Sequence, residues 1–334
     1  VTGVLTCALP IFQMEQYAID LFDGHCDAVF LRYLSGGGLR RNDGHVDLER
    51  MGKYRRCAQF FALFGEPEPT PVRDLSGKTH RELFLEEYAL FEREMAANAD
   101  LAAFCRTGAE AEAAFRSGRR AAFLSVEGAE LLDCSLERLE EAHAMGVRAV
   151  NPTWNHVNAL SGTNAEEPER GLTPQGRVFV RKMERLGMLV DVSHLSDPGF
   201  WDVAEELSGP FFASHSNARA VFSHPRNLTD EQFTAIIDHN GVVGLNLYAN
   251  FLGERADLDT AIAHLEHWLE LGGERTVALG GDLDGCSSLP EGITGIQDLD
   301  RLWERLLQRN YSEALVRALF FENMMRVVSE VCTM

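Results

Sequence analysis

The stretch AIDLFDGH, residues 18–25, is a short apolar run that ends in polar and charged residues. Similar runs recur along the chain, and several are almost continuously apolar, which is typical of parallel strands covered on both faces. We therefore predict eight strands, at residues 18–25, 57–64, 121–128, 147–153, 187–194, 210–216, 241–248 and 276–282.

Helical patterns lie between and after these runs. They predict helices at residues 79–104, 135–145, 174–186, 198–207, 229–239, 258–271, 298–308 and 312–330. No repeat or Pro/Gly/Ser-rich linker interrupts the alternation. Eight strands alternating with helices over about 310 residues match the count and the size of a (β/α)8 TIM barrel. A doubly wound α/β sheet is the alternative fold.

Composition indicates a folded, acidic protein. The 334 residues contain 31 Lys and Arg against 51 Asp and Glu, a formal net charge of −20. Because nucleic acid recruits a basic surface, we expect no nucleic acid partner. No apolar stretch approaches the roughly 20 residues of a membrane-spanning helix, so we expect no membrane partner. The seven scattered cysteines form no C-x-x-C pair, which favours a reducing, cytoplasmic location.

The amino terminus requires a separate interpretation. Residues 1–11, VTGVLTCALPI, are uncharged and look superficially like a signal peptide without its basic region. They also closely resemble the translation of a common sequencing-library adapter, with one difference at Leu5. We therefore expect residues 1–11 to be a non-native segment, Met14 to be a native start, and residues 12–334 to form a single TIM-barrel domain.

Polar residues collect at the carboxyl ends of the predicted strands, where barrels of this kind carry their chemistry. His25 and Asp27 are two residues apart, so on a strand their side chains share one face. Glu127, His194 and His215 stand at the ends of three further strands. Imidazole and carboxylate groups suit Zn²⁺, and five of them exceed what one tetrahedral catalytic ion with an open position can use. Two ions that share a carboxylate are the simplest arrangement.

Each of these residues also has a structural interpretation. A lone histidine at a strand end is more often a hydrogen-bonded structural residue than a ligand, and a lone aspartate before a helix is usually an N-cap. Five such groups at the same end of separate strands are hard to explain by capping, so together they indicate a metal site. His264 and His267 share a helix face without a third ligand, and we expect them to be surface residues.

The strings DGHCD, VEGAE, LGMLVDVSH, ASHS, HPRN and GGDLDG, in this order and spacing, resemble the membrane (renal) dipeptidase family of zinc metallopeptidases in the amidohydrolase superfamily. The segment HVDLERM with AQFFALF is also similar, and the resemblance covers about residues 17–330. It implies a barrel of the metal-dependent hydrolase type with two Zn²⁺ per chain. One zinc would be bound by His25 and Asp27, the other by His194 and His215, and Glu127 would bridge them.

The same resemblance implies how the remaining site residues act. A metal-bridging hydroxide would attack the peptide bond of a dipeptide, and Asp282 would be the acid/base beside it. Arg226 matches the arginine that binds the substrate carboxylate, with Asn227 next to it in the expected substrate site. A guanidinium fork can hold a carboxylate in bidentate fashion, although a structural ion pair is the alternative role for Arg226.

One position departs from the best-known animal members of the family. They carry a histidine directly after the threonine at the fourth strand end, whereas this chain reads Thr153-Trp154-Asn155-His156, a run that resembles bacterial members. His156 is therefore a candidate for the catalytic role of holding the oxyanion, or for a residue that only lines the pocket.

Three functions remain open from the sequence. The first is a zinc dipeptidase, the second a binuclear hydrolase of another small amide such as an N-acyl amino acid or a cyclic amide, and the third a non-catalytic barrel. The complete ligand set with Asp282 argues against the third, and Arg226 favours the first because it is useful only for a substrate with a carboxylate. Small dipeptides are the expected partners, and a homodimer is left open.

Overall fold

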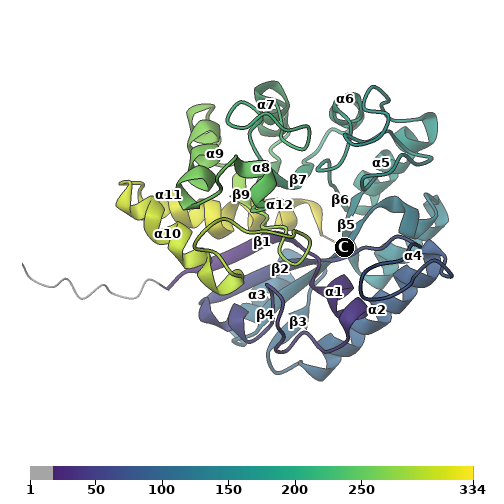
Figure 1. Ribbon diagram of the computed structural model, residues 1–334, viewed down its shortest axis with the longest axis horizontal. Helices are drawn as coiled ribbons and strands as arrows, with labels where there is room; N and C mark the ends of the chain where they lie inside the picture. The colour runs from purple at the N-terminus through teal and green to yellow at the C-terminus, as the bar shows by residue number, and fades with distance from the viewer. Residues whose placement is uncertain (1–17, 334) are drawn as a thin grey trace, which may run out of the picture.

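The structure is a computed structural model that describes residues 18–333 (Figure 1). The interpretation of residues 1–11 and of Met14 as a start falls outside the described residues. Within them, no helix combines the length and the apolar character that crossing a bilayer requires. The six described cysteines are buried and free.

Eight parallel strands form the barrel, and they follow one another around it in chain order. The sheet order is β6-β5-β4-β2-β1-β9-β8-β7, and its two ends meet where Asp191, after β6, forms a parallel bridge with Phe212 of β7. The predicted (β/α)8 barrel is therefore confirmed. The strands are β1 (Asp20–Cys26), β2 (Arg56–Leu63), β4 (Arg120–Glu127), β5 (Val147–Asn151), β6 (Leu189–Val190), β7 (Phe212–Ser216), β8 (Val242–Leu245) and β9 (Val277–Leu279).

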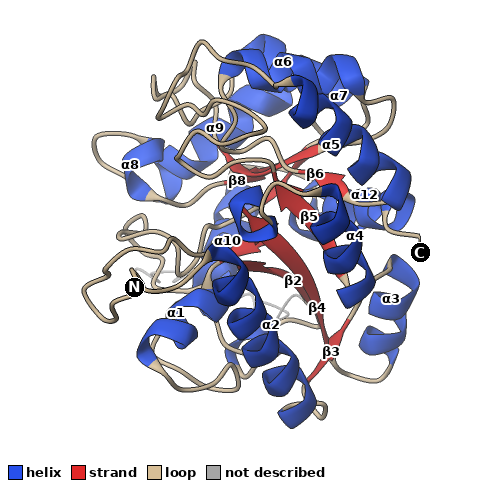
Figure 2. Cartoon of the chain, turned by 90° about the vertical axis from the view of Figure 1, so that its right-hand side faces the viewer, coloured by secondary structure: helices blue, strands red, loops and turns tan. Residues whose placement is uncertain are grey.

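Helices surround the strands, as Figure 2 shows in blue around red. The longer ones are α1 (Ala28–Ser35), α2 (His80–Ala97), α3 (Gly108–Arg116), α4 (Leu136–Met145), α5 (Pro174–Leu186), α6 (Asp197–Glu206), α7 (Asp230–Asp238), α9 (Leu258–Glu270), α10 (Leu299–Gln308) and α12 (Asn323–Val331). Shorter ones are α8 (Ala249–Leu252), α11 (Glu313–Arg317), η1 (Arg50–Lys53), η2 (Ala129–Leu132), η3 (Ile296–Asp298) and η4 (Ala318–Glu322).

Local sequence explains where these helices begin and end. Thr79 and Glu82 form a capping box at the start of α2, which satisfies two backbone donors reciprocally. Thr229 and Gln232 do the same for α7. At the other end, α4 stops at Gly146, whose φ of 104° is accessible to glycine at little cost.

The structure corrects the predicted helix at residues 79–104. The helix ends at Ala97, and the chain then forms a ninth strand, β3 (Ala102–Phe104). This strand pairs with the first residues of β4, on the edge that β5 occupies further along, so it extends the sheet below the barrel. The apolar residues of β3 continue the pattern of the helix, which is why the periodicity alone did not separate them. Helices α1, α3 and α8 were also not predicted.

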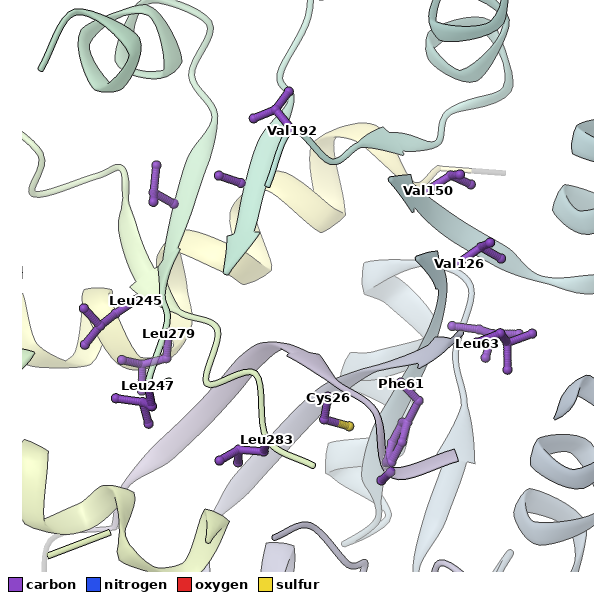
Figure 3. Close-up of a cluster of buried hydrophobic side chains, with 14 of the residues drawn as sticks. Cys26, Phe61, Leu63, Val126, Val150, Val192, Leu245, Leu247, Leu279 and Leu283 are labelled. Carbon is purple, nitrogen blue, oxygen red and sulfur yellow. The ribbon is translucent and has the colours of Figure 1, made fainter. Parts of the chain in front are cut away.

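Two hydrophobic clusters fill the molecule. An inner cluster inside the barrel contains Phe22, Phe60 and Phe123, whose ring centroids lie 5.3–5.8 Å apart. The outer cluster lies between strands and helices, and Figure 3 shows its members around the ring of strands, among them Phe61 and Val126. Neighbouring residues such as Phe60 and Phe61 thus face opposite sides, as the two-residue period of a strand requires. Phenylalanine rings fill one part of the barrel interior, and the polar strand ends occupy another.

The prediction that His264 is a surface residue is wrong. This histidine of α9 is fully buried. Its Nδ1 accepts a hydrogen bond from the backbone amide of Ala218 at 3.1 Å, and its Nε2 lies 3.0 Å from the carbonyl oxygen of Leu252. His264 therefore ties the loops after β7 and β8 to the helix, a role that periodicity cannot reveal.

Candidate metal centre and substrate cavity

A bulge in β1 turns His25 and Asp27 toward the barrel axis. Phe22 belongs to the inner cluster and Cys26 to the outer one, although both have even numbers and would share a face in a regular strand. The register against β2 shifts between Asp23 and Cys26, where β1 contains one extra residue. Such a bulge re-aims the side chains that follow it. His25 and Asp27 therefore face the same interior as Phe22.

Glu127, the last residue of β4, lies between the histidines. Its Oε1 is 2.9 Å from Nε2 of His194 and 3.4 Å from Nε2 of His215, and its Oε2 is 3.6 Å from Nε2 of His25. The Nε2 atoms of His194 and His215 are 3.0 Å apart. One carboxylate thus presents a different oxygen to each of two groups of donors. The structure brings these four predicted residues together.

Asp27 and Asp282 join the group around His25. Nε2 of His25 lies 3.4 Å from Oδ2 of Asp27. Ligand atoms of His25, Asp27 and Asp282 all lie within 4.8 Å of one another, and so do those of His25, Glu127 and His215. Asp282 follows β9, and its Oδ2 accepts a hydrogen bond of 3.1 Å from Nδ2 of Asn246.

The donor set suits divalent cations. Nε2 of His25 and Oδ1 of Asp27 are buried atoms without a hydrogen-bond partner, so both are available as ligands. The Nδ1 of His215 contacts Oγ of Ser214 at 2.7 Å, and the Nδ1 of His194 contacts Oδ1 of Asn155 at 3.1 Å. Because partners of this kind fix the orientation of the ring, both Nε2 atoms remain directed at the centre. Imidazole nitrogen and carboxylate oxygen are ligands that zinc accepts.

Burial and neighbouring charges set the protonation of the histidines. Burial, with a contribution from Arg226, lowers the pKa of His194 to about 4. Burial also holds the pKa of His215 well below its usual value, with His25 as the next cause. For His25, burial opposes the charge, but the carboxylates of Glu127 and Asp27 raise the pKa well above its usual value. The negative field that favours a proton on His25 equally favours a metal cation.

The carboxylates divide into two kinds. Burial opposes ionisation of Glu127, but the surrounding histidines, first of all His25, hold its pKa well below the usual range. Burial raises the pKa of Asp282 to about 7 and that of Asp27 to about 6. A carboxyl with a pKa near 7 can exchange a proton at neutral pH, which is the property of a general acid/base.

A cavity of about 530 Å³ opens over these residues. Its lining includes Asp27, Glu127, His194 and Asp282 at the base, together with apolar side chains of α1 and of the loops after β2, β5 and β8. The cavity can hold a small molecule of a few tens of atoms at most. A molecule bound there would lie directly on the candidate metal-binding residues.

Arg226 also lines the cavity. It lies in the loop after β7 with only 6% of its surface exposed. Its Nη1 donates to the carbonyl oxygen of Ser193, and its Nη2 lies 3.1 Å from Nε2 of His194. Among the described residues it forms no ion pair within 4.0 Å, so the structural ion pair considered from the sequence is not present there. A buried guanidinium without a carboxylate partner is suited to bind an anionic ligand.

Two predicted site residues are not brought into the cavity. Asn227 is buried, but its Nδ2 donates to the carbonyl oxygens of Phe222 and Phe251, at 2.9 Å each, and thereby supports the loop that carries Arg226. The side chain of His156 is 50% exposed and its Nδ1 lies 2.9 Å from Oε1 of Glu166. Neither residue lines the cavity. The exposed position of His156 gives it no contact with the candidate metal ligands.

Asn155 lines the cavity instead, and sequence reasoning missed it. Its Oδ1 contacts the ring of His194, and Trp154 next to it forms part of the apolar wall. The signal was its place beside His156 in the run that follows β5. The prediction chose His156 because histidine is a more frequent catalytic residue than asparagine.

A (β/α)8 barrel with three histidines and three acidic residues gathered at its strand ends defines the class of metal-dependent hydrolases. The sequence model of the membrane dipeptidase family, peptidase family M19, matches residues 14–334. The chain belongs to this family of metallodipeptidases, which confirms the resemblance seen in its motifs.

Known proteins agree with this assignment. A metallopeptidase from Rhodobacter sphaeroides, solved with a phosphinate mimic of the dipeptide L-Ala-D-Ala, superposes with a TM-score of 0.85 at 28% identity, over 94% of this chain and 100% of that one. Dipeptidase tcpJ of Claviceps purpurea is 30% identical over 86% of this chain and 69% of its own length. An uncharacterized protein from the pqqA 5′ region of Klebsiella pneumoniae is 34% identical over 75% of this chain and 96% of its own length.

Proposed function

We propose that this metallodipeptidase hydrolyses the peptide bond of small dipeptides with two zinc ions. The observation that carries the proposal is Glu127, whose two carboxylate oxygens face different groups of ligands. His25 and Asp27 would hold one ion, His194 and His215 the other, and Glu127 both. When bound, the pair would lower the pKa of a shared water toward about 7 and polarise the substrate carbonyl.

Asp282 would move the proton. It lines the cavity within reach of His25 and Asp27, where burial raises its pKa above that of an exposed aspartate. Asn246 holds one of its oxygens and thus the orientation of the carboxyl group. The side chain would accept the proton of the attacking water and deliver it to the amine that leaves, so no serine or cysteine nucleophile is required.

Arg226 would bind the free carboxylate of the dipeptide. Its guanidinium is buried in the cavity wall, 3.1 Å from His194, so a carboxylate bound to it would lie close to the candidate metal ligands. The Rhodobacter sphaeroides structure supports a dipeptide as the substrate, because that protein of the same fold was solved with a dipeptide mimic.

The apolar part of the cavity lining favours an apolar side chain on the substrate. Phe64, after β2, packs edge-on against Phe30 of α1 at 5.0 Å and against Trp154 at 4.7 Å. Leu31 and Leu34 of α1 extend this surface into the cavity. Since burial of an apolar side chain against such a surface releases water, we expect dipeptides with leucine, methionine or phenylalanine to be better substrates than those with charged residues.

A substrate panel tests the proposal. Purified protein is loaded with zinc and given free dipeptides, the same dipeptides with amidated carboxyl termini, and N-acetyl amino acids. We expect rapid release of amino acids from the free dipeptides alone. Preferential cleavage of N-acetyl amino acids would replace the dipeptidase assignment with a hydrolase of other small amides, and equal cleavage of amidated dipeptides would remove the role of Arg226.

A further inference from the structure

The segment that carries Asp282 contains a second bulge. Asp23 of β1 pairs with Leu279 of β9, and Cys26 pairs with Leu283 beyond the strand. The stretch between the two pairings is therefore one residue longer on the β9 side than on β1. The extra residue lies within Gly280-Gly281-Asp282. A bulge interrupts the regular hydrogen bonds between strands and needs other acceptors for its backbone amides.

Asp23 supplies one of these acceptors. Its carboxylate is completely buried, and its Oδ1 accepts a hydrogen bond of 2.6 Å from the backbone amide of Gly281. Its Oδ2 accepts a hydrogen bond of 2.7 Å from Nε2 of Gln59 on β2. One side chain thus connects β1 with both neighbours in the sheet, at the level where β9 leaves its regular pairing.

The backbone directly after this contact is unusual. Asp282 has φ of 55°, in the left-handed region that non-glycine residues seldom adopt. A conformation of this kind persists only where the surrounding structure determines it. The hydrogen bond to Asp23 fixes the backbone amide of Gly281, the residue before Asp282, and Asn246 fixes the carboxyl group of Asp282 itself. A side chain at Gly281 would approach Oδ1 of Asp23 to 3.3 Å, so the glycine permits the close contact.

We propose that Asp23 is the positioning residue of Asp282: by accepting the amide of Gly281 in the bulge, it aims the acid/base into the cavity. The inference rests on the proposed role of Asp282 in dipeptide hydrolysis. A displacement of about 1 Å in a catalytic group can cost a hundredfold in rate. Asp23 therefore acts on the rate of the reaction without a contact to the substrate.

Two substitutions separate the hydrogen bond from the charge. In Asp23→Asn the amide oxygen still accepts from Gly281, and Gln59, whose Oε1 has no partner, can rotate to accept from the new amide group. In Asp23→Leu a side chain of similar size offers no acceptor. With zinc content unchanged, we expect kcat for a dipeptide to fall about 30-fold or more in Asp23→Leu with KM within about threefold, and Asp23→Asn to restore most of it.

Gln59→Leu is the matched control. It removes the other partner of the same carboxylate, so it disturbs the same buried place but leaves the contact with Gly281. It should lower the melting temperature and leave kcat within about threefold of the wild type. In a background of Asp282→Asn, the change Asp23→Leu should cause no further loss, because both act through one group. Equal loss of kcat in Gln59→Leu and Asp23→Leu, or an additive double variant, would overturn the proposal.

Hydrogen exchange tests the contact independently of any activity. Peptides that span residues 280–286 should exchange faster in Asp23→Leu than in the wild type, whereas Asp23→Asn and Gln59→Leu should keep the protection. Unchanged exchange in Asp23→Leu would show that Asp23 does not hold the bulge. If the wild type cleaves no dipeptide but the exchange pattern is as expected, the proposed function fails while the structural role of Asp23 stands.

Discussion

Nε2 of His194 and Nε2 of His215 lie 3.0 Å apart, and both face the same oxygen of Glu127. The two histidines come from neighbouring strand ends, after β6 and within β7. Because their Nδ1 atoms face Oδ1 of Asn155 and Oγ of Ser214, both Nε2 atoms can present a lone pair to a cation. The low pKa values of both rings and the charge of Glu127 make a metal cation the group that this geometry accommodates.

Substitution of Glu127 by glutamine tests the shared carboxylate. The amide keeps the shape but loses the charge and one ligand oxygen. We expect zinc content to fall from about two ions per chain to about one or fewer, and kcat to fall by roughly 100-fold or more. Elemental analysis and dipeptide kinetics on the same preparation measure both. Two tightly bound zinc ions with wild-type turnover would contradict the bridging role.

The variant Asp282→Asn tests proton transfer. The amide is nearly isosteric and can still accept from Asn246, but it cannot carry a proton at neutral pH. Folding and zinc content should be retained while kcat falls by about 10²–10⁴-fold. Steady-state kinetics with metal analysis provide the measurement, and turnover close to that of the wild type would remove Asp282 from the mechanism.

Arg226→Lys tests recognition of the substrate carboxylate. Lysine keeps the positive charge but loses the bidentate fork, so kcat/KM for free dipeptides should fall by about 10–100-fold. Amidated dipeptides should be poor substrates of the wild type and change little in the variant. Arg305→Lys is the control, because Arg305 pairs with Asp259 of α9, outside the cavity. An equal effect of the two substitutions would show that Arg226 is a structural residue.

Glu87 predicts a dependence of stability on pH. This glutamate of α2 is fully buried, and burial raises its pKa well above the usual value, although the backbone amide of Phe64 donates to it at 3.2 Å. A carboxyl with a pKa raised by folding contributes fully to stability below its unfolded pKa of about 4.3, and this contribution declines as the pH rises toward the folded pKa.

Glutamine at position 87 resembles the protonated acid at every pH. Glu87→Gln should therefore melt roughly 2–6 °C above the wild type at pH 8 and show a smaller difference at pH 5. Melting curves of both proteins with the same zinc load measure this. A variant that is less stable than the wild type at pH 8 would show that folding does not raise the pKa of Glu87.

The barrel could be predicted from the sequence because each of its eight strands is an apolar run with a polar end. Buried parallel strands need apolar residues on both faces. The helices between them differ, because their apolar residues recur with a period of about 3.6. The strand β3 was not predicted, because its three residues continue the apolar pattern of α2. Helix α1 was not predicted, because it begins directly after the polar residues at the end of the first strand.

The site was predictable in its residue types and less so in its geometry. Spacing placed His25 and Asp27 on one face, but only the bulge in β1 decides that this face is the interior. His156 and Asn155 are neighbours in the chain, and the fold exposes one while it directs the other to His194. Asp23 stands in the string DGHCD, but the sequence did not reveal its role, because its partners Gln59 and Gly281 are distant in sequence.

The most direct test of the central claim is a crystal structure of the zinc-loaded protein with anomalous data collected on both sides of the zinc absorption edge. We predict two peaks within the cavity, one beside His25 and Asp27 and one beside His194 and His215, with Glu127 between them. A single peak, or zinc bound away from Glu127, would contradict a two-metal centre that this carboxylate bridges.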